Sequence, residues 1–401
     1  MEAYIIDGIR TPIGNFGGSL STVRTDDLAA LVIKELVRRN PSLPSEVIDD
    51  VILGCNNQAG EDNRNVARMA LLLAGLPVTV PGETVNRLCA SGMSAVINAF
   101  HSIRAGEGNV FIAGGVENMT RGPWVISKSS VPFGNDAQMF DSSFGWRFIN
   151  PKMKQLYGTD AMGETAENLV DLYKITREDQ DHFAFHSHMR AAKARDSGRF
   201  AEEIVPVKIS LKKGEVILFT NDEFIKDNTT LEKLATLKPA FRKDSGTVTA
   251  GNSSGINDGA VALYIASETA VKKYNLLPKA RIVASAVVGV EPRIMGIGPV
   301  EATKKALNRA GLKLADIDII EFNEAFAAQT LACIRQLGLS AGDSRINPNG
   351  GAIALGHPLG MSGARIIQTA VIELHKQNKR YALATLYVGV GQGYATIIEK
   401  V

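Results

Sequence analysis

The residue best placed for covalent chemistry in this sequence is Cys89. It precedes the small residues Ala-Ser-Gly and then an apolar segment, a pattern that predicts a helix beginning just after it. A thiol at a helix N-terminus lies near unpaired backbone N–H groups, which stabilise the nucleophilic thiolate. We expect Cys89 to react with thioesters, because exchange of one thiol for another is nearly balanced in free energy. The alternative, a small buried apolar side chain, is our interpretation of Cys55 and Cys333.

A second candidate is His357, an isolated histidine in the glycine-rich segment Asn349-Gly-Gly-Ala-Ile-Ala-Leu-Gly-His-Pro-Leu-Gly. Glycines on both sides let the backbone approach a ligand closely, and Pro358 suits the first turn of a helix. An imidazole here can take the proton of a thiol or donate a hydrogen bond to a thioester oxygen. The alternative is a hydrogen-bonded histidine of the core.

Two further segments could stabilise negative charge on a substrate oxygen. The run Gly389-Val-Gly-Gln-Gly lacks the spacing of a dinucleotide fingerprint, and the strand-like segment 394–398 follows it instead of a helix. We interpret it as a tight loop whose backbone N–H groups face an oxyanion. Asn323, in Asn-Glu-Ala-Phe after a predicted strand, could hold a water molecule or polarise a carbonyl; the alternative is a helix N-cap.

The remaining histidines do not form a metal site by their spacing. His182 and His186 share a helix face, but His188 projects elsewhere and no Glu or Cys completes a ligand pattern. We interpret all three as a solvated helix face and predict no metal.

The composition excludes several classes of protein. The 401 residues include 44 basic and 42 acidic side chains with no basic run, so nucleic acid is not an expected partner. No apolar run reaches the roughly 18 residues of a membrane span, and the N-terminus is not a signal peptide. Three cysteines are too few and odd in number for a disulfide framework, which indicates a reducing compartment, the cytoplasm.

Strand-like apolar runs alternate with amphipathic helical stretches in the first and last thirds of the chain, which predicts a layered α/β architecture. The predicted strands include 4–6, 51–53, 110–113, 317–320 and 381–386, and a helix is predicted around 28–37.

An internal repeat gives the domain organisation. The segment that begins at Cys89 (Cys-Ala-Ser-Gly-Met-Ser-Ala) resembles the one that begins at His357 (His-Pro-Leu-Gly-Met-Ser-Gly), and 48–54 resembles 317–323 at nearly the same spacing. We therefore predict two related halves, 1–120 (completed by 247–271) and 272–401. If the halves pack about a pseudo-twofold axis, one brings a thiol and the other an imidazole to a shared site at two helix N-termini.

The intervening segment 121–246 has a different pattern, with prolines, two tryptophans and many polar residues. It contains a predicted helix that begins at Thr176, with Asp179 forming a capping box, and ends near Gly198. We predict an inserted loop or lid domain, after which the glycine-rich stretch 247–259 returns the chain to the first half.

These motifs together resemble the thiolase family over essentially the whole chain. The matching segments are Arg10-Thr-Pro-Ile-Gly, Asn86-Arg-Leu-Cys-Ala-Ser-Gly, Gly163-Glu-Thr-Ala-Glu-Asn, Thr249-Ala-Gly-Asn-Ser-Ser-Gly, Asn323-Glu-Ala-Phe-Ala-Ala-Gln and 349–360. The stretch Gly145-Trp-Arg-Phe-Ile-Asn-Pro-Lys-Met is most similar to the 3-oxoadipyl-CoA thiolase branch.

The resemblance implies the thiolase fold: two βαβαβαββ halves, each with a five-stranded sheet, in a five-layer α-β-α-β-α core with an inserted loop domain. It implies that Cys89 is the acylated nucleophile, that His357 activates it, and that Asn323 holds an oxyanion-hole water. The N–H groups of Cys89 and Gly389 would form a second oxyanion hole.

The resemblance also implies how the substrate is bound and how the chain assembles. Ala250 and Ser254 would line the pantetheine path, Met162 would be a further contact, and the loop domain would carry the coenzyme A nucleotide. Coenzyme A would be a substrate, with no tightly bound cofactor, and the chain would form a homodimer or homotetramer.

One position departs from the family pattern. Where the family has a second cysteine as acid/base in Cys-x-Gly, this chain has Tyr387. A phenol, with a pKa of ~10 against ~8.5 for a thiol, is a poorer base and is bulkier. In addition, Ala161 stands where some biosynthetic thiolases have a histidine that contacts coenzyme A, which disfavours an acetoacetyl-CoA substrate.

The expected activity is ping-pong cleavage of a 3-oxoacyl-CoA by coenzyme A, or the reverse condensation, through an acyl group on Cys89. Because of Tyr387, two alternatives remain at this stage. One is an acyl-CoA transferase or hydrolase without condensing activity. The other is a catalytically silent acyl-CoA-binding protein with the same fold.

Overall fold

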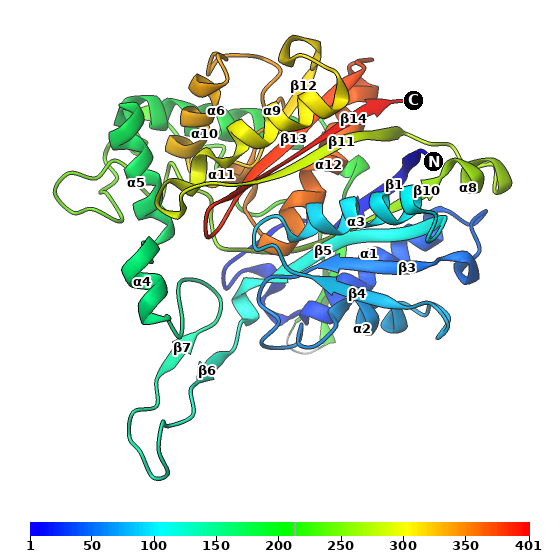
Figure 1. Ribbon diagram of the computed structural model, residues 1–401, viewed down its shortest axis with the longest axis horizontal. Helices are drawn as coiled ribbons and strands as arrows, with labels where there is room; N and C mark the ends of the chain where they lie inside the picture. Colours follow the sequence, from blue (N-terminus) through cyan, green and yellow to red (C-terminus); the bar gives the residue numbers. More distant parts are fainter. Residues whose placement is uncertain (212–213) are drawn as a thin grey trace.

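A large mixed sheet organises the molecule (Figure 1). The computed structural model describes residues 1–211 and 214–401. Within these residues ten strands form one sheet in the order β12-β13-β14-β11-β1-β10-β5-β3-β4, with β2 pairing to β10. The strands are β1 (Ala3–Arg10), β2 (Gly14–Asn15), β3 (Asp50–Gly54), β4 (Gly82–Val85), β5 (Val110–Asn118), β10 (Asn257–Ser267), β11 (Ala280–Gly289), β12 (Ile319–Phe322), β13 (Tyr381–Val388) and β14 (Gln392–Lys400).

The sheet consists of two halves with the same strand pattern. Counted outward from the middle, the first half runs β1, β10, β5, β3, β4 and the second runs β11, β14, β13, β12. In each half the inner pairs are antiparallel, whereas β5 with β3 and β13 with β12 are parallel. The place of β4 is taken in the second half by Ile346, which makes a single parallel bridge to Ile320.

The two halves of the sheet are joined edge to edge. The innermost strands β1 and β11 pair with each other through Tyr4 with Arg281 and Ile5 with Ala280, so the sheet is continuous. The physical reason is that an unpaired strand edge exposes backbone N–H and C=O groups, and each edge here supplies partners for the other. The predicted strand 317–320 begins later, at Ile319, because a 3-10 helix over Leu314–Asp316 precedes it.

The helices and sheet halves form the expected five layers. Helices α1 (Thr25–Arg39) and α2 (Val66–Leu73) cover the outer face of the first half, and α9 (Gly298–Ala310) and α10 (Ala327–Gln336) cover that of the second. Helices α3 (Ser91–Ala105) and α12 (Leu359–Lys376) lie between the halves and contact each other. Both are buried on nearly all sides, as a central layer requires, and three apolar clusters fill the spaces between layers.

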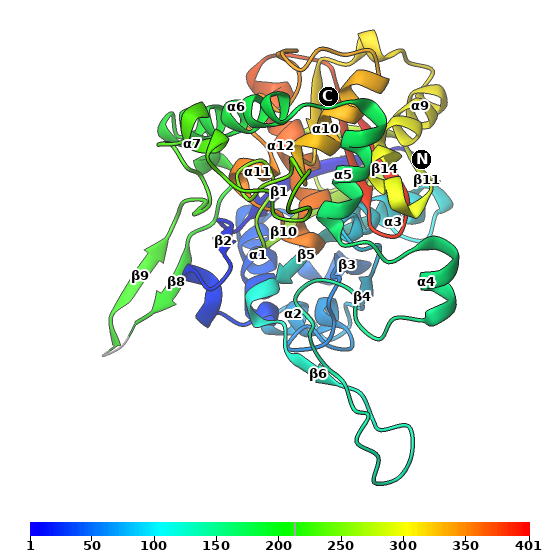
Figure 2. The ribbon, with the colours of Figure 1, turned by 90° about the vertical axis from the view of Figure 1, so that its left-hand side faces the viewer.

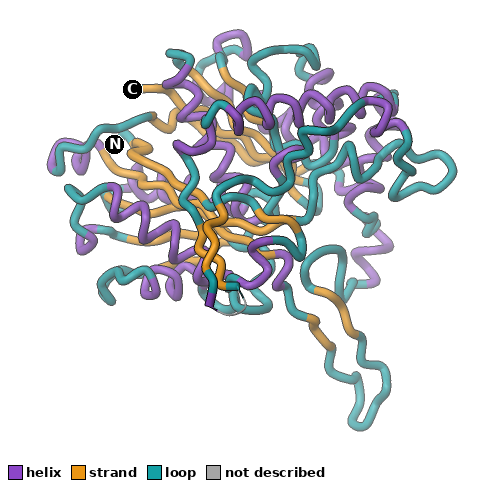
Figure 3. Tube along the Cα trace, turned by 180° about the vertical axis from the view of Figure 1, so that it is seen from behind, coloured by secondary structure: helices purple, strands orange, loops and turns teal. Residues whose placement is uncertain are grey.

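The inserted segment lies between the end of β5 and the start of β10. It contains β6 (Trp124–Ile126), β7 (Met139–Asp141), α4 (Pro151–Tyr157), α5 (Met162–Tyr173), α6 (Arg177–Asp196), β8 (Val207–Ser210), β9 (Val216–Phe219) and α7 (Leu231–Ala235). The hairpins β6–β7 and β8–β9 project from the body (Figure 2), and the chain termini lie on the side away from β6–β7 (Figure 3). The remaining helices are α8 (Glu268–Lys273) and the short α11 (Ala352–Leu355).

The predicted helix of the insertion is confirmed. Thr176 is its N-cap: its hydroxyl accepts from the backbone N–H of Asp179, whose carboxylate accepts from the N–H of Thr176. Helix α6 then ends at Asp196. Helices α5 and α6 pack on α10 and α11, so this part of the insertion lies against the second half of the core, whereas β8 packs on the first half.

No helix among the described residues is both long enough and apolar enough to cross a membrane.

Candidate active site

The N-termini of the two central helices meet. Cys89 lies two residues before the start of α3, and His357 lies two residues before the start of α12. The second residue of each helix is a glycine, and a Cβ atom on Gly92 would lie 2.5 Å from the carbonyl oxygen of Gly360. Such a close backbone approach requires glycine. The fold therefore brings the segments that carry the thiol and the imidazole together, one from each half.

Cys89 is held in a strained, buried turn. Leu88, immediately before it, has a φ of 47°, a left-handed conformation that is uncommon for a leucine. The backbone N–H groups of Gly389 and of Cys89 itself act on the sulfur in the direction that lowers its pKa. These are the two N–H groups that the family resemblance assigns to an oxyanion hole.

Burial outweighs these N–H groups in setting the ionisation of the thiol. Burial raises the pKa of Cys89 to about 11, although the hydrogen bonds from Gly389 and from its own N–H oppose the rise. The sequence-based expectation of a stabilised thiolate is therefore wrong for the ligand-free protein. The physical reason is that removal from water disfavours the charged form more than two N–H groups favour it.

His357 is oriented by hydrogen bonds that fix its tautomer. The Ser362 hydroxyl donates to the carbonyl oxygen of Pro358 at 2.8 Å, so its oxygen accepts from Nδ1–H of His357 at 2.6 Å. The other ring nitrogen, Nε2, is then the unprotonated acceptor. Burial, with a further contribution from the Arg365 charge, lowers the pKa of His357 to about 3. The imidazole is thus neutral and ready to accept a proton.

Asn323 lies at the end of β12 and faces His357. Its Nδ2 is 3.3 Å from Nε2 of His357. Its Oδ1 is buried and has no hydrogen-bond partner within residues 1–211 and 214–401, which marks a polar position suited to a ligand or a water molecule. The alternative N-cap interpretation is wrong, because the N-cap of α10 is Phe326.

Tyr387 lies on β13 two residues before Gly389 and is almost completely buried, with 3% of its surface exposed. Burial and then the neighbouring Cys89 raise the pKa of its phenol well above the usual value. The tyrosine is therefore a neutral phenol beside the thiol.

The other predicted binding residues lie toward the solvent side. Ser254 is half-buried, and its N–H donates to the carbonyl oxygen of Ala325 at 2.9 Å, beside Asn323. Ala250 is exposed in the same loop, and Met162 is half-buried as the first residue of α5.

The buried carboxylate of Glu117, which the sequence analysis did not identify, connects two segments of the site. Glu117, near the end of β5, accepts from the N–H groups of Gly360 at 2.9 Å, Asn56 at 2.9 Å and Asn57 at 3.0 Å. It thereby joins the first turn of α12 to the loop after β3. Burial raises the pKa of Glu117 to about 7. The available signal was an acidic residue directly after the apolar run 110–116.

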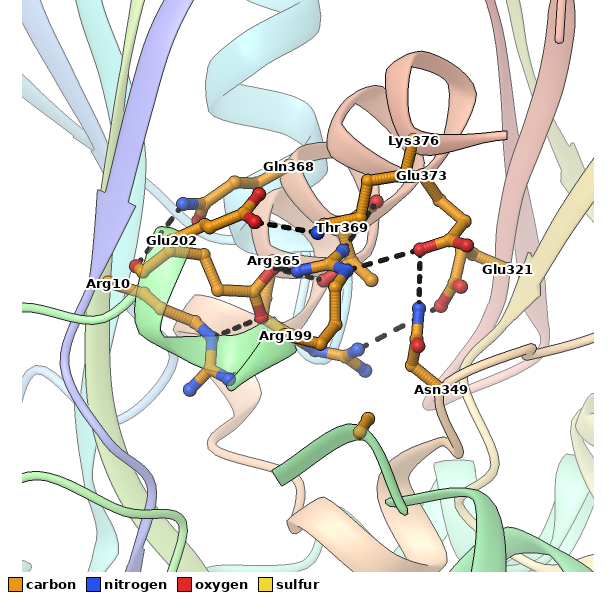
Figure 4. Close-up of polar contacts among 12 residues, drawn as sticks. Arg10, Arg199, Glu202, Glu321, Asn349, Arg365, Gln368, Thr369, Glu373 and Lys376 are labelled. Atoms are coloured by element: carbon orange, nitrogen blue, oxygen red, sulfur yellow. Dashed lines mark hydrogen bonds and ion pairs between the residues drawn. The ribbon is translucent and has the colours of Figure 1, made fainter. Parts of the chain in front are cut away.

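A second polar cluster joins β1, α12 and the insertion (Figure 4). Arg10 donates to Glu203 through Nε and to Asp222 through both Nη atoms, which joins β1 to the insertion. Nη1 of Arg365 on α12 lies 3.9 Å from Oε2 of Glu321 on β12. Within the described chain neither of these two side chains has a hydrogen-bond partner. These two residues span the same pair of elements, β12 and α12, as Asn323 and His357.

The histidines of α6 need one correction. His182 and His186 are exposed as expected, but His188 is buried and its Nδ1 accepts from the N–H of Lys226 at 3.2 Å. The side chains of α6 face the core through residues such as Ala184 and Ala191, and His188 lies on that side.

One group with metal-ligand chemistry occurs in the part of the chain that the structure describes: Cys55, Asp62 and Glu117. Its oxygens already accept from backbone N–H groups, including those of Gly60 and Gly360, and the thiol of Cys55 faces Asp62 at 3.7 Å. Cys55 and Cys333 are fully buried, as predicted.

Comparison with known proteins agrees with this architecture. Residues 3–269 match the family model described as "Thiolase, N-terminal domain" and residues 276–400 match "Thiolase, C-terminal domain". The chain is 60% identical to "3-oxoadipyl-CoA/3-oxo-5,6-dehydrosuberyl-CoA thiolase" of Escherichia coli (strain K12), with 100% of both chains covered. It is 56% identical to "Beta-ketoadipyl-CoA thiolase" of Acinetobacter baylyi, again with 100% of both covered.

Solved structures are similar over the same length. Human mitochondrial 3-ketoacyl-CoA thiolase has a TM-score of 0.93 and 42% identity, covering 100% of this chain and 99% of the other. Bacillus anthracis acetyl-CoA acetyltransferase has a TM-score of 0.90 and 42% identity, with the same coverage. With both family models matched across nearly the whole chain, this protein belongs to the thiolase family.

Proposed function

We propose that this chain cleaves 3-oxoadipyl-CoA with coenzyme A to acetyl-CoA and succinyl-CoA, through an acyl group carried on Cys89. The observation that carries the proposal is the site itself. The sulfur of Cys89 rests against two backbone N–H groups, at a helix N-terminus that touches the helix preceded by His357. The choice of substrate is supported by 60% identity over the full chain to the Escherichia coli 3-oxoadipyl-CoA thiolase.

In the first half-reaction the Cys89 sulfur attacks the 3-keto carbon of the substrate. Nε2 of His357 accepts the thiol proton, since Nδ1–H is committed to Ser362. The bond between C2 and C3 then breaks, and its electron pair forms the enolate of acetyl-CoA. The hydroxyl of Tyr387, a neutral phenol at the acid/base position, gives its proton to C2, and acetyl-CoA leaves. The N–H groups of Cys89 and Gly389 stabilise the oxyanion on C3, and Asn323 with His357 stabilises the enolate oxygen.

In the second half-reaction coenzyme A regenerates the enzyme. The Tyr387 phenolate takes the thiol proton of coenzyme A, whose sulfur attacks the succinyl thioester carbon. The sulfur of Cys89 leaves and regains the proton held by His357. One thioester bond breaks and one forms, so no other reactant is required.

Both catalytic side chains are uncharged near neutral pH: Cys89 is a thiol and His357 is a neutral imidazole. With the pKa of Cys89 at about 11 and that of His357 at about 3, charge separation is unfavourable until a substrate carbonyl is present. Proton transfer therefore accompanies attack on the carbonyl. This arrangement protects the nucleophile from unproductive reactions.

Tyr387 bears on the step that makes or breaks the carbon–carbon bond. At this position the family uses a cysteine that moves the proton at C2, and a buried phenol with a raised pKa is a weaker acid and base than a thiol. Loss of a well-matched acid/base group lowers rates by about 10²–10⁴-fold. We propose that Tyr387 slows this step and leaves acylation of Cys89 intact. A transferase or hydrolase without condensing activity is the second candidate function that Tyr387 favours.

Coenzyme A-dependent cleavage of 3-oxoadipyl-CoA, compared between the wild type and Tyr387→Cys, tests the proposed activity and the proposed effect of Tyr387 on its rate. We expect a measurable wild-type rate and an increase of about tenfold or more in the variant. Equal rates would show that Tyr387 does not limit the carbon–carbon step. No cleavage by either protein, with acylation retained, would favour the transferase or hydrolase function.

We further propose that Ala250, Ser254 and Met162 line the pantetheine path, with the nucleotide of coenzyme A on the inserted domain 121–246 acting as a lid. The support is their position: Ser254 is bonded to the segment after Asn323, and Ala250 is open to solvent. Coenzyme A is then a substrate and not a resident cofactor. Three reduced cysteines suit a reducing compartment such as the cytoplasm.

The chain is proposed to work as a homodimer or homotetramer. The projecting β6–β7 hairpin supports this, because its apolar side chains are exposed in a single chain, including Trp124 at 67%, Ile126 at 65% and Phe133. Exposed apolar groups that gather in one place usually mark a contact surface.

A further inference from the structure

A small cavity lies beside the Gly389 loop, on the side of the inserted domain. One wall is Val390, the residue next to the N–H group that faces the sulfur of Cys89. The other walls come from the segment between β7 and α5 and from the 3-10 helix Pro292–Ile297. Because Val390 directly follows Gly389, this shallow cavity, which opens to solvent, lies one residue along the chain from the N–H group that acts on Cys89.

The lining of this cavity is mostly apolar, with one cationic side chain, Arg293, and one anionic side chain, Asp160. Its aromatic and aliphatic walls include Trp146, Tyr157, Met295 and Val390, whereas Arg293 supplies the only positive charge among its lining residues. Apolar walls with a single cation suit a short methylene chain that ends in an anion.

Arg293 is held in place by a hydrogen bond from its Nε atom, whereas its two Nη atoms are unpaired within the described chain. Its Nε donates to Asp160 at 3.0 Å, and its carbonyl oxygen accepts from Nδ2 of Asn168 at 2.9 Å. Asp160 is itself fixed, since Nδ2 of Asn168 also donates to its carboxylate. In the described chain the two Nη atoms of Arg293 have no hydrogen-bond partner. The side chain is 59% exposed, so an incoming ligand can reach these atoms.

Arg10 of the same chain shows how one guanidinium serves two carboxylates. Its Nε donates to Glu203 while its two Nη atoms bind Asp222 in a bidentate pair. Arg293 has the first half of this arrangement through Asp160, and its Nη pair is left for a second carboxylate. Because Asp160 balances the charge of Arg293, selection of a carboxylate rests on the paired N–H geometry and not on net charge.

We propose that Arg293 binds the distal carboxylate of a dicarboxylic acyl group and so determines the specificity of the enzyme for such acyl-CoA substrates. The inference rests on the proposed function and names a residue for its substrate class. The thioester end lies at Cys89, the methylenes lie along the apolar walls, and the terminal carboxylate pairs with the Nη atoms of Arg293.

Binding of succinyl-CoA and butyryl-CoA, measured by calorimetry, tests this assignment. The two acyl groups have the same number of carbons and differ in a terminal carboxylate or methyl group. Cys89→Ala serves as the background, so that no acyl transfer occurs. We expect this protein to bind succinyl-CoA about tenfold or more tightly than butyryl-CoA, as a charge-assisted bidentate pair implies.

Adding Arg293→Gln should remove this preference and leave the affinity for butyryl-CoA unchanged within about twofold. Arg293→Lys should lose most of the preference, because it keeps the charge without the paired N–H groups of the guanidinium. Arg38→Gln is the matched control; this arginine is exposed on α1, pairs with Glu35, and should change neither affinity.

If Arg293→Gln lowers the affinity for succinyl-CoA and for butyryl-CoA equally, Arg293 has only a structural role and the proposal is overturned. An unchanged preference, or no preference before the substitution, would overturn it as well. The measurement involves no catalysis, so failure of the proposed reaction, seen as absent acylation of Cys89 in the wild type, remains distinguishable.

Discussion

At the scale of single residues, the site contains a thiol whose pKa is raised and an imidazole whose pKa is lowered. Burial is the main cause of both shifts, upward for Cys89 and downward for His357. Neither group gains a charge near neutral pH in the ligand-free protein. In the reaction that we propose, the backbone N–H groups around Cys89 serve the oxyanion more than a resting thiolate.

This state predicts the pH dependence of alkylation of Cys89 by iodoacetamide. Only the thiolate reacts, so with a pKa of about 11 the rate should rise about tenfold per pH unit from pH 7 to 10 without a plateau. His357, with a pKa of about 3, stays neutral over this range and should add no second step. Peptide mass analysis should place the label on Cys89, with Cys89→Ala as control. A plateau below pH 9 would contradict the assigned burial.

Sequence reasoning found the reactive residues but not their ionisation. Cys89 and His357 stand out because each lies in a run of small residues before a helix. The pKa shifts depend on how completely distant segments cover these side chains, which no local pattern contains. Glu117 was missed for a similar reason: its role arises from the N–H groups of residues distant in sequence that the fold brings to it.

At the scale of elements, backbone contacts near the helix N-termini position the site. A Cβ atom on Gly115 of β5 would overlap the carbonyl group of Gly360 in the first turn of α12. Strand and helix are therefore in contact through their backbones, and Glu117, two residues along the strand, bonds to the N–H of the same glycine.

Gly115→Ala should destabilise the protein by about 3 kcal/mol, because the backbone of α12 must move away from β5. Urea unfolding followed by circular dichroism would measure the change. Gly342→Ala is the control: its Cβ atom would have one neighbour, at 3.7 Å, and its effect should stay within about 0.5 kcal/mol. Equal stability of the two variants would show that the close approach is not required.

The elements themselves were largely predictable. The capping box of α6 and the repeated helix starts at Ser91 and Leu359 are encoded in local sequence. What could not be predicted is how the halves join. The β1–β11 pairing and the replacement of β4 by Ile346 depend on which strand edges face each other after folding.

At the scale of the whole molecule, the two halves supply the layered core and the insertion supplies the surroundings of the site. The insertion is tied to the core through buried charges, since Arg10 of β1 bonds to Glu203 and Asp222. It also carries Arg293's partner Asp160 and the projecting β6–β7 hairpin.

The hairpin gives a prediction about assembly. In the oligomer that we propose, Trp124→Ser with Phe133→Ser should lower the solution mass measured by light scattering, because the exposed apolar contact is lost. Folding of the single chain should change by only about 0.5 kcal/mol, since both side chains are exposed in it. Leu277→Ser, exposed at 83% but distant in sequence from the hairpin, is the control. An unchanged mass in the hairpin variant would exclude this surface as the contact.

The acyl group on Cys89 is the step on which the proposed function depends, and intact-mass measurement tests it most directly. After mixing with acetyl-CoA, the wild type should gain one acetyl group per chain, located at Cys89 by peptide mapping and released on addition of coenzyme A. Cys89→Ala should gain none. A wild type that remains unmodified, or an acetyl group on another residue, would contradict acyl transfer through this cysteine.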